Sequence, residues 1–347
     1  MSATSSCGNR RLTTALLVAV FAFAGCYAFI NGFHDVSNSV AAAVRTRALT
    51  PGVAVVLASV FNLLGALMST ALALVLADLF VKLPPGSSGL GILMAGLASA
   101  CAWGLWTWWR RMPSSSTHAL VGGIIGSGAA SALVGGPSIT ESFRILWDQI
   151  ALPLLLSPVI AFVLAYLLVY PVMWLMRYSS LRRGDAGNRI AQSVLSAAFS
   201  VGHGMQDGQR TMAVLVLGLV AAGYSTGTEI PWGVQVFAGT ALAAGSLFGG
   251  WRITHTLGYR LVRIDPLRGM SAQAVATGML FLGGLWLHIP LSSTQTMTAA
   301  IVGAGANRRF AAVRFIPLRN ILGTWLITAP AAALLGGIFF LALSPLL

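Results

Sequence analysis

The sequence predicts an all-α polytopic membrane protein with about 10–12 membrane segments, since a helix needs ~20 residues to cross a bilayer. Two features of composition support this fold class: 56% of the 347 residues are hydrophobic and only 8% are charged. A soluble domain carries about a quarter charged residues. The third observation is that the long apolar stretches are apolar on every side. Strands of a membrane β-barrel alternate polar and apolar residues instead, so a barrel is disfavoured.

Ten apolar stretches follow one another along the chain. They fall near residues 12–44, 51–77, 89–109, 113–134, 149–176, 189–222, 231–250, 271–289, 291–307 and 320–345. Residues 10–26 resemble a signal peptide, with Arg10 and Arg11, then an apolar core, then Cys26 at a cleavage-like position. Because the apolar run continues past Cys26 to Ile30 and many more runs follow, we expect a first transmembrane helix instead.

The formal charge is +13, from 21 basic and 8 acidic residues. In a soluble protein this would suggest binding to nucleic acid. Here the arginines fall mostly between the apolar stretches, as the positive-inside rule predicts for cytoplasmic segments. We therefore expect a multi-pass plasma-membrane protein that contacts membrane lipid and no nucleic acid. The three cysteines lack metal-ligand spacing.

Two pairs of segments are similar between the halves of the chain. NGFHD at 31–35 aligns with HGMQD at 203–207, which places Asp35 and Asp207 at a separation of 172 positions. PSSSTHALVGGIIGSG at 113–128 aligns with PLSSTQTMTAAIVGAG at 290–305, at a separation of 177 positions. The motifs occur in the same order in both halves, which indicates an internal repeat.

Each half holds five apolar stretches, an odd number, so the second half is expected to enter the membrane from the opposite face. This predicts two inverted-topology repeats, the plan of many secondary transporters. The predicted parts are an N-terminal repeat, 1–178, with a carboxylate motif at 29–44 and a Ser/Thr motif at 113–128; a basic cytoplasmic linker, 179–189; and a C-terminal repeat, 190–347, with a carboxylate motif at 199–214 and a Ser/Thr motif at 290–305.

Asp35 and Asp207 are the acidic residues that lie deep within apolar stretches. A carboxylate at the bilayer centre costs ~3 kcal/mol or more, so two at equivalent places predict a shared polar cavity rather than helix-stapling ion pairs. Such a carboxylate can bind Na⁺ or carry a proton. Glycines and side-chain amides surround both residues, and glycine permits the backbone to unwind. We therefore expect a broken helix at each carboxylate motif, each lining half of a binding site.

The Ser/Thr motifs place a run of hydroxyls just after a proline and before a small apolar helix. This pattern is typical of a helix N-terminus, where free N–H groups and the helix dipole favour an anion. Two such termini suit a tetrahedral oxyanion such as phosphate or sulfate. His34 is the first candidate for a proton carrier. Arg210 can contact an oxyanion or pair with Asp207, and the sequence leaves both open.

The segments NGFHDVSNSVAAAVRTRALTP, PSSSTHALVGGIIGSG, HGMQDGQRTMAV and GWRITHTLGYRLVRIDPLRGMSAQA together resemble the PiT-type inorganic phosphate transporters, most closely the bacterial low-affinity permeases. The resemblance implies a dimeric inverted-repeat symporter that moves phosphate with Na⁺ or H⁺, in some members as a complex with a divalent metal. It implies no enzymatic cofactor. The expected phosphate-binding residues are Asp35, Asn38, Ser115, Ser116, Thr117, Gln206, Asp207, Arg210, Ser292, Ser293 and Thr294. The expected cation or proton residues are Asn31, His34, Asp35 and Asp207, the two aspartates also being the candidate Na⁺ ligands.

The chain departs from the family pattern at both carboxylate motifs. His34 and Gln206 stand where the family often has asparagine, and Arg210 stands where a bacterial relative often has lysine. These changes lead us to expect H⁺ rather than Na⁺ as the coupling ion. Two alternatives stay open, a sulfate permease of the same family and a passive anion channel. An enzyme is not expected, because the sequence has neither a nucleotide-binding loop nor a nucleophile–base pair at recognisable spacing.

Overall fold

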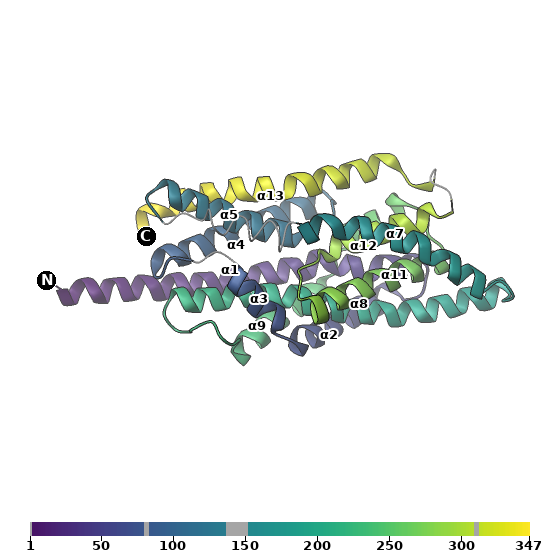
Figure 1. Ribbon diagram of the computed structural model, residues 1–347, viewed down its shortest axis with the longest axis horizontal. Coiled ribbons are helices and arrows are strands. Elements are labelled where there is room, and N and C mark those ends of the chain that lie inside the picture. The colour runs from purple at the N-terminus through teal and green to yellow at the C-terminus, as the bar shows by residue number, and fades with distance from the viewer. Residues whose placement is uncertain (1, 80–82, 137–151, 309–311) are drawn as a thin grey trace.

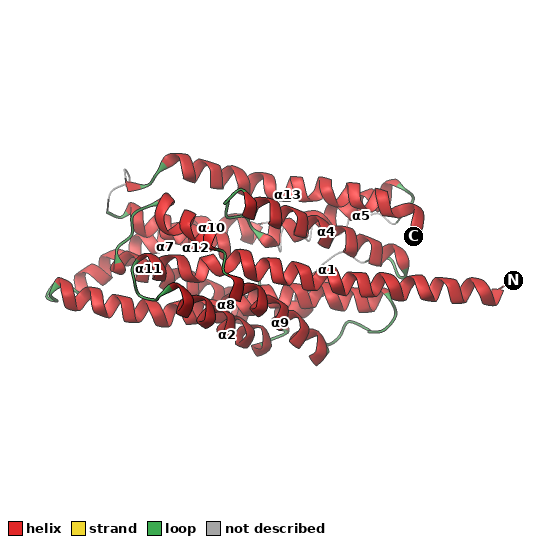
Figure 2. Ribbon diagram, turned by 180° about the vertical axis from the view of Figure 1, so that it is seen from behind, coloured by secondary structure: helices red, strands yellow, loops and turns green. Residues whose placement is uncertain are grey.

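The computed structural model is a bundle of long helices that run along one common direction (Figures 1 and 2). The structure describes residues 2–79, 83–136, 152–308 and 312–347, and of residues 2–10, 78 and 79 the backbone alone. The helices are α1 (Ser2–Arg45), α2 (Pro51–Met68), α3 (Ala71–Leu79), α4 (Ser87–Trp109), α5 (Ser116–Leu133), α7 (Leu152–Leu175), α8 (Leu181–Ala221), α9 (Trp232–Phe248), α10 (Trp251–His255), the π-helix η2 (Thr256–Leu261), α11 (Pro266–Phe281), the π-helix η3 (Leu282–Leu287), α12 (Ser293–Ala306), α13 (Phe315–Leu343) and the 3₁₀ turn η5 (Ser344–Leu346).

Six of the described helices are long and apolar enough to cross a bilayer, and a seventh candidate is the bent pair of α9 with the Trp251–Leu261 segment. The fold class is therefore the predicted one, an all-α protein with many membrane segments. The remaining apolar stretches form shorter pieces. Helix α3 has 9 residues, α12 has 14 and α5 has 18, so α3 and α12 fall short of the ~20 residues that a full crossing needs.

The two carboxylate motifs are not broken, contrary to the expectation from their glycines. Helix α1 runs without interruption through 29–44, and α8 runs through 199–214. An unbroken helix satisfies its own backbone hydrogen bonds, which buried segments in a membrane require. The breaks lie elsewhere, between α2 and α3 at Ser69–Thr70 and between α9 and α10 at Gly249–Gly250, where the chain bends by 57°.

The motif glycines instead permit close contact between helices. A Cβ on Gly32 of α1 would lie 2.0 Å from the carbonyl oxygen of Leu242 in α9. A Cβ on Gly204 of α8 would lie 2.0 Å from the carbonyl oxygen of Asn62 in α2. Real Cβ atoms essentially never approach another heavy atom this closely, so both positions require glycine.

The two halves of the chain interlock through reciprocal pairs of helices. The first helix of each half packs on the second helix of the other, α1 on α9 and α8 on α2. The helix that begins at each Ser/Thr motif packs on the last helix of the other half, α5 on α13 and α12 on α7. This reciprocity is the arrangement that a two-fold repeat predicts. The inverted orientation and the boundaries at 178 and 190 stay predictions, and residues 181–189 form the first turns of α8.

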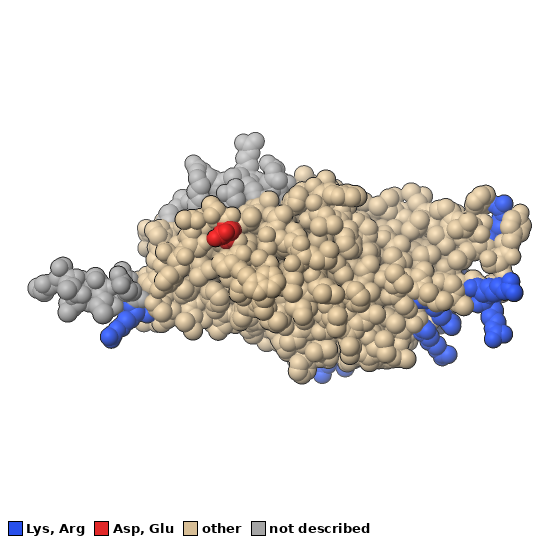
Figure 3. Space-filling view, turned by 90° about the horizontal axis from the view of Figure 1, so that it is seen from below, with Lys and Arg blue, Asp and Glu red and all other residues tan. Residues whose placement is uncertain are grey.

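Most exposed arginines gather at one end of the molecule, as Figure 3 shows. The C-terminal end of α1, the turn from α7 to α8 and the start of α13 all lie at this end (Figure 1). Arg182 and Arg183 at the start of α8 and Arg252 and Arg260 in the α10–η2 segment are exposed there. The positive-inside rule predicts that this end faces the cytoplasm.

The close contact at Gly204 gives a first prediction. We expect Gly204→Ala to lower the melting temperature of the detergent-purified protein, because its Cβ meets the Asn62 carbonyl oxygen at 2.0 Å. The control is Gly187→Ala in the exposed first turns of the same helix, where a Cβ meets nothing within 4 Å. Alanine there should stabilise by up to ~1 kcal/mol through helix propensity. Equal melting temperatures for the two variants would contradict the packing role of Gly204.

Candidate functional site

The two motif carboxylates meet at the crossing of α1 and α8. Asp35 and Asp207 are both 0% exposed. The imidazole of His203 lies between them, with Nε2 3.3 Å from Asp207 Oδ2 and 4.0 Å from Asp35 Oδ2. Side chains that stand 172 positions apart in the sequence thus form one buried cluster, in which the candidate ligand atoms of all three residues lie within 4.8 Å of one another.

Hydrogen bonds to the carboxylates cross between the halves of the chain. Asn31 in α1 donates to Asp207 Oδ2 in α8 at 2.9 Å. Thr294 in α12 donates to Asp35 Oδ1 in α1 at 2.9 Å. Ser116 at the start of α5 donates to Asp35 Oδ2 at 3.3 Å. Each carboxylate is therefore held by a side chain from the other half, and the predicted shared polar site has a common centre.

The two carboxylates differ in how their charge is balanced. Arg210, itself 1% exposed, donates to Asp207 Oδ1 at 2.5 Å and also to the backbone carbonyl of Leu291. Asp207 therefore has a fixed positive partner, and the alternative that the sequence left open for Arg210 is realised as an ion pair. Asp35 is bonded to Nδ1 of His34 at 2.8 Å and to hydroxyls. Its charge is balanced only when an imidazole is protonated or a cation binds.

Both Ser/Thr motifs begin a helix, as predicted. Ser115 caps α5 by accepting from the backbone N–H of His118 at 3.3 Å, and Ser292 caps α12 by accepting from that of Gln295 at 3.3 Å. These caps are equivalent positions of the sequence alignment, 177 residues apart. Since Ser116 and Thr294 both reach Asp35, the two helix N-termini converge on the carboxylate cluster, where their positive dipole ends favour negative charge.

The remaining expected residues divide into two groups. Asn38 donates to Thr294 Oγ1 at 3.0 Å and so belongs to the central cluster. Gln206 accepts from the backbone N–H of Leu291 at 3.3 Å and thereby holds the segment just before α12. Thr117 and Ser293 are buried beside the helix caps, 2% and 1% exposed. No expected site residue lies at the surface among those that the structure describes.

Two side chains of the cluster were not in the expected set. His203 opens the second carboxylate motif and stands four residues before Asp207, so helical periodicity is a signal that places both on one face. Asn62 in α2 accepts a hydrogen bond from His203 Nδ1 through its Oδ1 oxygen at 3.0 Å. Asn62 belongs to no motif, and only the packing of α2 on α8 reveals it.

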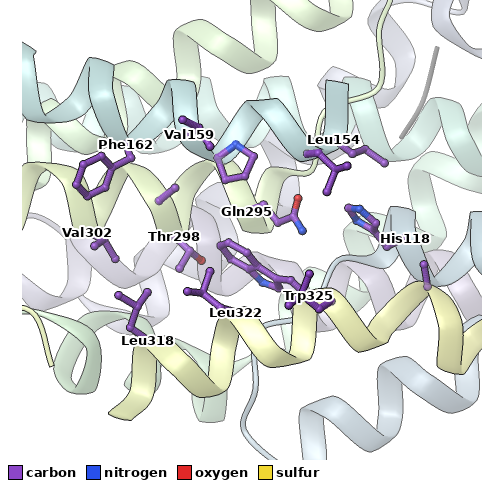
Figure 4. Close-up of a pocket in the computed structure, with 15 residues that line it drawn as sticks. His118, Leu154, Val159, Phe162, Gln295, Thr298, Val302, Leu318, Leu322 and Trp325 are labelled. Carbon is purple, nitrogen blue, oxygen red and sulfur yellow. The ribbon is translucent and has the colours of Figure 1, made fainter. Parts of the chain in front are cut away.

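One cavity is lined by residues of the cluster, and a second lies beside the two Ser/Thr motifs. A small one of about 20 Å³ lies between Asn31 and His34 of α1 and the Ser114–Ser116 segment, and this volume is sufficient for about one water molecule. A larger one of about 710 Å³ is lined mainly by apolar side chains of α7, α12 and α13 (Figure 4). Its polar lining includes His118 and Gln295, which follow the two hydroxyl runs at equivalent positions.

Several buried oxygens at the centre have no hydrogen-bond partner within the described part of the chain. They are Asn31 Oδ1, Asn38 Oδ1, Thr117 Oγ1 and Gln295 Oε1. Oxygen atoms are the ligands that hard cations prefer, and an unpaired buried oxygen is costly unless a ligand satisfies it. The site therefore fits a small cation on its oxygen side, while His203 and His34 supply proton-binding nitrogens beside Asp35.

A helical membrane bundle that buries carboxylates and an arginine where short helices begin has the architecture of a secondary transporter. Comparison with known proteins agrees. The profile of the phosphate transporter family matches residues 31–336. A probable low-affinity inorganic phosphate transporter of Rhizobium meliloti is 38% identical over 95% of this chain and 97% of its own length. One of Bacillus subtilis is 35% identical over 96% of this chain and 98% of its own length.

The chain belongs to the phosphate transporter family. It is accordingly a multi-pass transporter of the plasma membrane and not an enzyme. A solved structure, titled the sodium-dependent phosphate transporter, has the same fold, with a TM-score of 0.81 over 96% of this chain and all of that one, at 20% identity.

The Asp207–Arg210 ion pair gives a second prediction. We expect Asp207→Asn to cost about 3–5 kcal/mol of stability, because it leaves the buried Arg210 guanidinium without its charge partner. Adding Arg210→Gln should recover most of the loss. Asp35→Asn is the control, since it leaves the ion pair intact and should change stability less. Thermal unfolding of the three purified variants provides the measurement, and a double variant no more stable than Asp207→Asn would contradict the pairing.

Proposed function

We propose that the protein is a symporter that imports inorganic phosphate together with H⁺ by alternating access. The observation that carries this proposal is the setting of Asp35. It is fully buried, it faces two helix N-termini, and the nearest basic groups are the imidazoles of His34 and His203 rather than an arginine. A carboxylate in this setting must be neutralised before an anion can come close.

The phosphate site is proposed at the convergence of α5 and α12. Free N–H groups at a helix start and the positive dipole end bind phosphate oxygens, and the caps Ser115 and Ser292 place two such starts beside the cluster. Arg210 lies against Leu291, one residue before the α12 cap, where its planar fork can add charge-assisted hydrogen bonds. The other proposed contacts are Asp35, Asn38, Ser116, Thr117, Gln206, Asp207, Ser293 and Thr294.

The coupling step follows from the charges of the cluster. With neutral histidines, Asp35, Asp207 and Arg210 sum to one negative charge in a buried environment, which repels phosphate strongly because the local dielectric is low. A proton shared by Asp35 and His34, whose Nδ1 and Oδ1 atoms are 2.8 Å apart, removes this charge. Proton binding then promotes phosphate binding, and release of either on the cytoplasmic side weakens the hold on the other.

H⁺ is proposed over Na⁺ because two imidazoles border the carboxylate that lacks a fixed positive partner. Na⁺ would instead use the oxygens of Asp35, Asp207, Asn31 and Asn38. A divalent metal carried as a complex with phosphate would meet the mixed nitrogen and oxygen donors of Asp35, His203 and Asp207, a donor set that suits such ions. Transport measurements distinguish H⁺ coupling from Na⁺ coupling, from transport of a metal–phosphate complex, from a sulfate permease and from a passive channel. The homodimer stays an expectation.

Uptake of labelled phosphate into liposomes that contain the purified protein tests the proposal. We expect phosphate to accumulate when a pH gradient is imposed, with little response to a Na⁺ gradient, to excess sulfate or to removal of divalent metal. Accumulation driven by a Na⁺ gradient alone would identify Na⁺ as the coupling ion in place of H⁺. Competition by sulfate would identify a sulfate permease. Dependence on divalent metal would show that phosphate is carried as a metal complex. Equilibration without accumulation would indicate a channel.

Substitution of Asp35 sharpens this test. We expect Asp35→Asn to abolish phosphate accumulation while the protein still inserts and purifies normally, because an asparagine can neither release a proton nor bind a cation by charge. Asp185→Asn is the matched control, because Asp185 lies near the start of α8, far from the cluster in sequence. Normal accumulation by the Asp35→Asn protein would overturn the coupling mechanism.

The proposed proton carrier can be tested separately. We expect His34→Gln to lose most of the uptake that a pH gradient drives, because glutamine cannot share a proton with Asp35. The control is His118→Gln, since the equivalent position of the second half already carries Gln295. Equal pH dependence in the two variants would remove His34 from the coupling step.

A further inference from the structure

Four arginines line a groove at the basic end of the molecule. Arg110 and Arg111 follow α4, Arg252 lies in α10, and Arg260 lies in η2. The start of α13, with Ile316, Pro317, Asn320 and Ile321, completes the wall. The groove has a volume of about 690 Å³, and it brings together segments that are more than 200 positions apart in the sequence.

None of the described residues that line the groove is acidic. The arginine ion pairs among the described residues are those of Arg210 with Asp207 and of Arg268 with Asp265, both outside the groove. Four arginines with no acidic residue among the described lining make this end of the groove strongly positive, which attracts an anion. The positive-inside rule explains why arginines occur at this end, but it does not require them to converge in one groove.

The arginines of the groove are held in place by their neighbours. The guanidinium of Arg252 lies over the ring of Trp108, 4.6 Å from its centroid, and that of Arg110 lies over Trp106 at 5.8 Å. Arg111 adopts the left-handed backbone conformation, with φ of 62°, and its carbonyl accepts from the hydroxyl of Thr256 at 3.0 Å. Such preorganisation lowers the entropy that binding an anion would otherwise cost.

Exposed aromatic and apolar side chains border the groove, as expected for a position at the membrane interface. Trp109, which lines it, is 61% exposed, and Phe315 and Ile316 at the start of α13 are 71% and 67% exposed. Exposed tryptophan at the end of a membrane helix is typical of the headgroup region. A groove lined by both arginines and apolar side chains matches the two parts of a phospholipid, its charged headgroup and the first carbons of its chains.

We propose that this arginine groove binds the phosphate group of an anionic phospholipid of the cytoplasmic leaflet. Basic pockets between membrane helices on the cytoplasmic side are recognised sites for such headgroups, and the planar guanidinium fork suits bidentate contact with phosphate oxygens. Pro113 lines the groove and lies two residues before the α5 cap at Ser115. The bound lipid therefore steadies the loop that leads into the first Ser/Thr motif.

The test is native mass spectrometry of the detergent-purified full-length protein, titrated with phosphatidylglycerol, with phosphatidylcholine, or with pyrophosphate as a soluble anion. We expect phosphatidylglycerol to bind at least about tenfold more tightly than phosphatidylcholine, and the double substitution Arg252→Gln/Arg260→Gln to abolish this preference, since each arginine near an anionic lipid contributes a comparable attraction. Arg110→Gln/Arg111→Gln is a second, independent pair in case the first does not fold.

The matched control removes the same charge elsewhere at the same end of the molecule. Arg182→Gln/Arg183→Gln changes two exposed arginines at the start of α8, and we expect it to keep the preference for phosphatidylglycerol. Three results would overturn the proposal: equal affinity of the unaltered protein for the two lipids, an equal loss in the control and in the groove variants, or displacement of the lipid by pyrophosphate, which would identify a soluble phosphate compound as the ligand.

Discussion

The structure depends on one constraint, the burial of charge where neither water nor lipid can stabilise it. Asp35, Asp207 and Arg210 are all at most 1% exposed, and an unpaired charge at membrane depth is costly. The chain meets this constraint by collecting the charges in a single cluster and surrounding them with donors from both halves. The helices capped by Ser115 and Ser292 are directed there, because their unpaired N–H groups need negative charge as much as the carboxylates need donors.

The close packing of α1 and α8 with their partners follows from the same constraint. Side chains as short as aspartate and asparagine can meet across helices only when the backbones approach closely, and Gly32 and Gly204 permit that approach. The reciprocal helix pairs, α1 with α9 and α8 with α2, hold each carboxylate helix close to its partner, and Asn62 of α2 also contacts His203 of the cluster. The polar site and the glycine contacts thus lie close together on the same helices, since each glycine stands three residues before its aspartate.

The grouping of the motifs at one site could be predicted from the sequence, because both halves of the chain carry a carboxylate motif and a Ser/Thr motif in the same order. The alignment of the Ser/Thr motifs placed Ser115 and Ser292 at equivalent positions, and both cap a helix beside the carboxylates. The glycines of the carboxylate motifs were misinterpreted as helix breaks, since glycine permits both unwinding and close packing, and only the neighbouring helix decides between them. The pairing of Arg210 with Asp207 and the contact of Asn62 with His203 also depend on how helices dock, which local sequence does not fix.

The unbroken helices at the carboxylate motifs determine which parts of the molecule can move. A site built on unwound backbone can change shape residue by residue. Here Asp35 and Asp207 are carried by the continuous helices α1 and α8, which pack closely on α9 and α2 at Gly32 and Gly204, so each carboxylate moves only with its whole helix. In the proposed alternating access, opening to either side of the membrane would then fall to the short helices α5 and α12 together with their long partners α13 and α7.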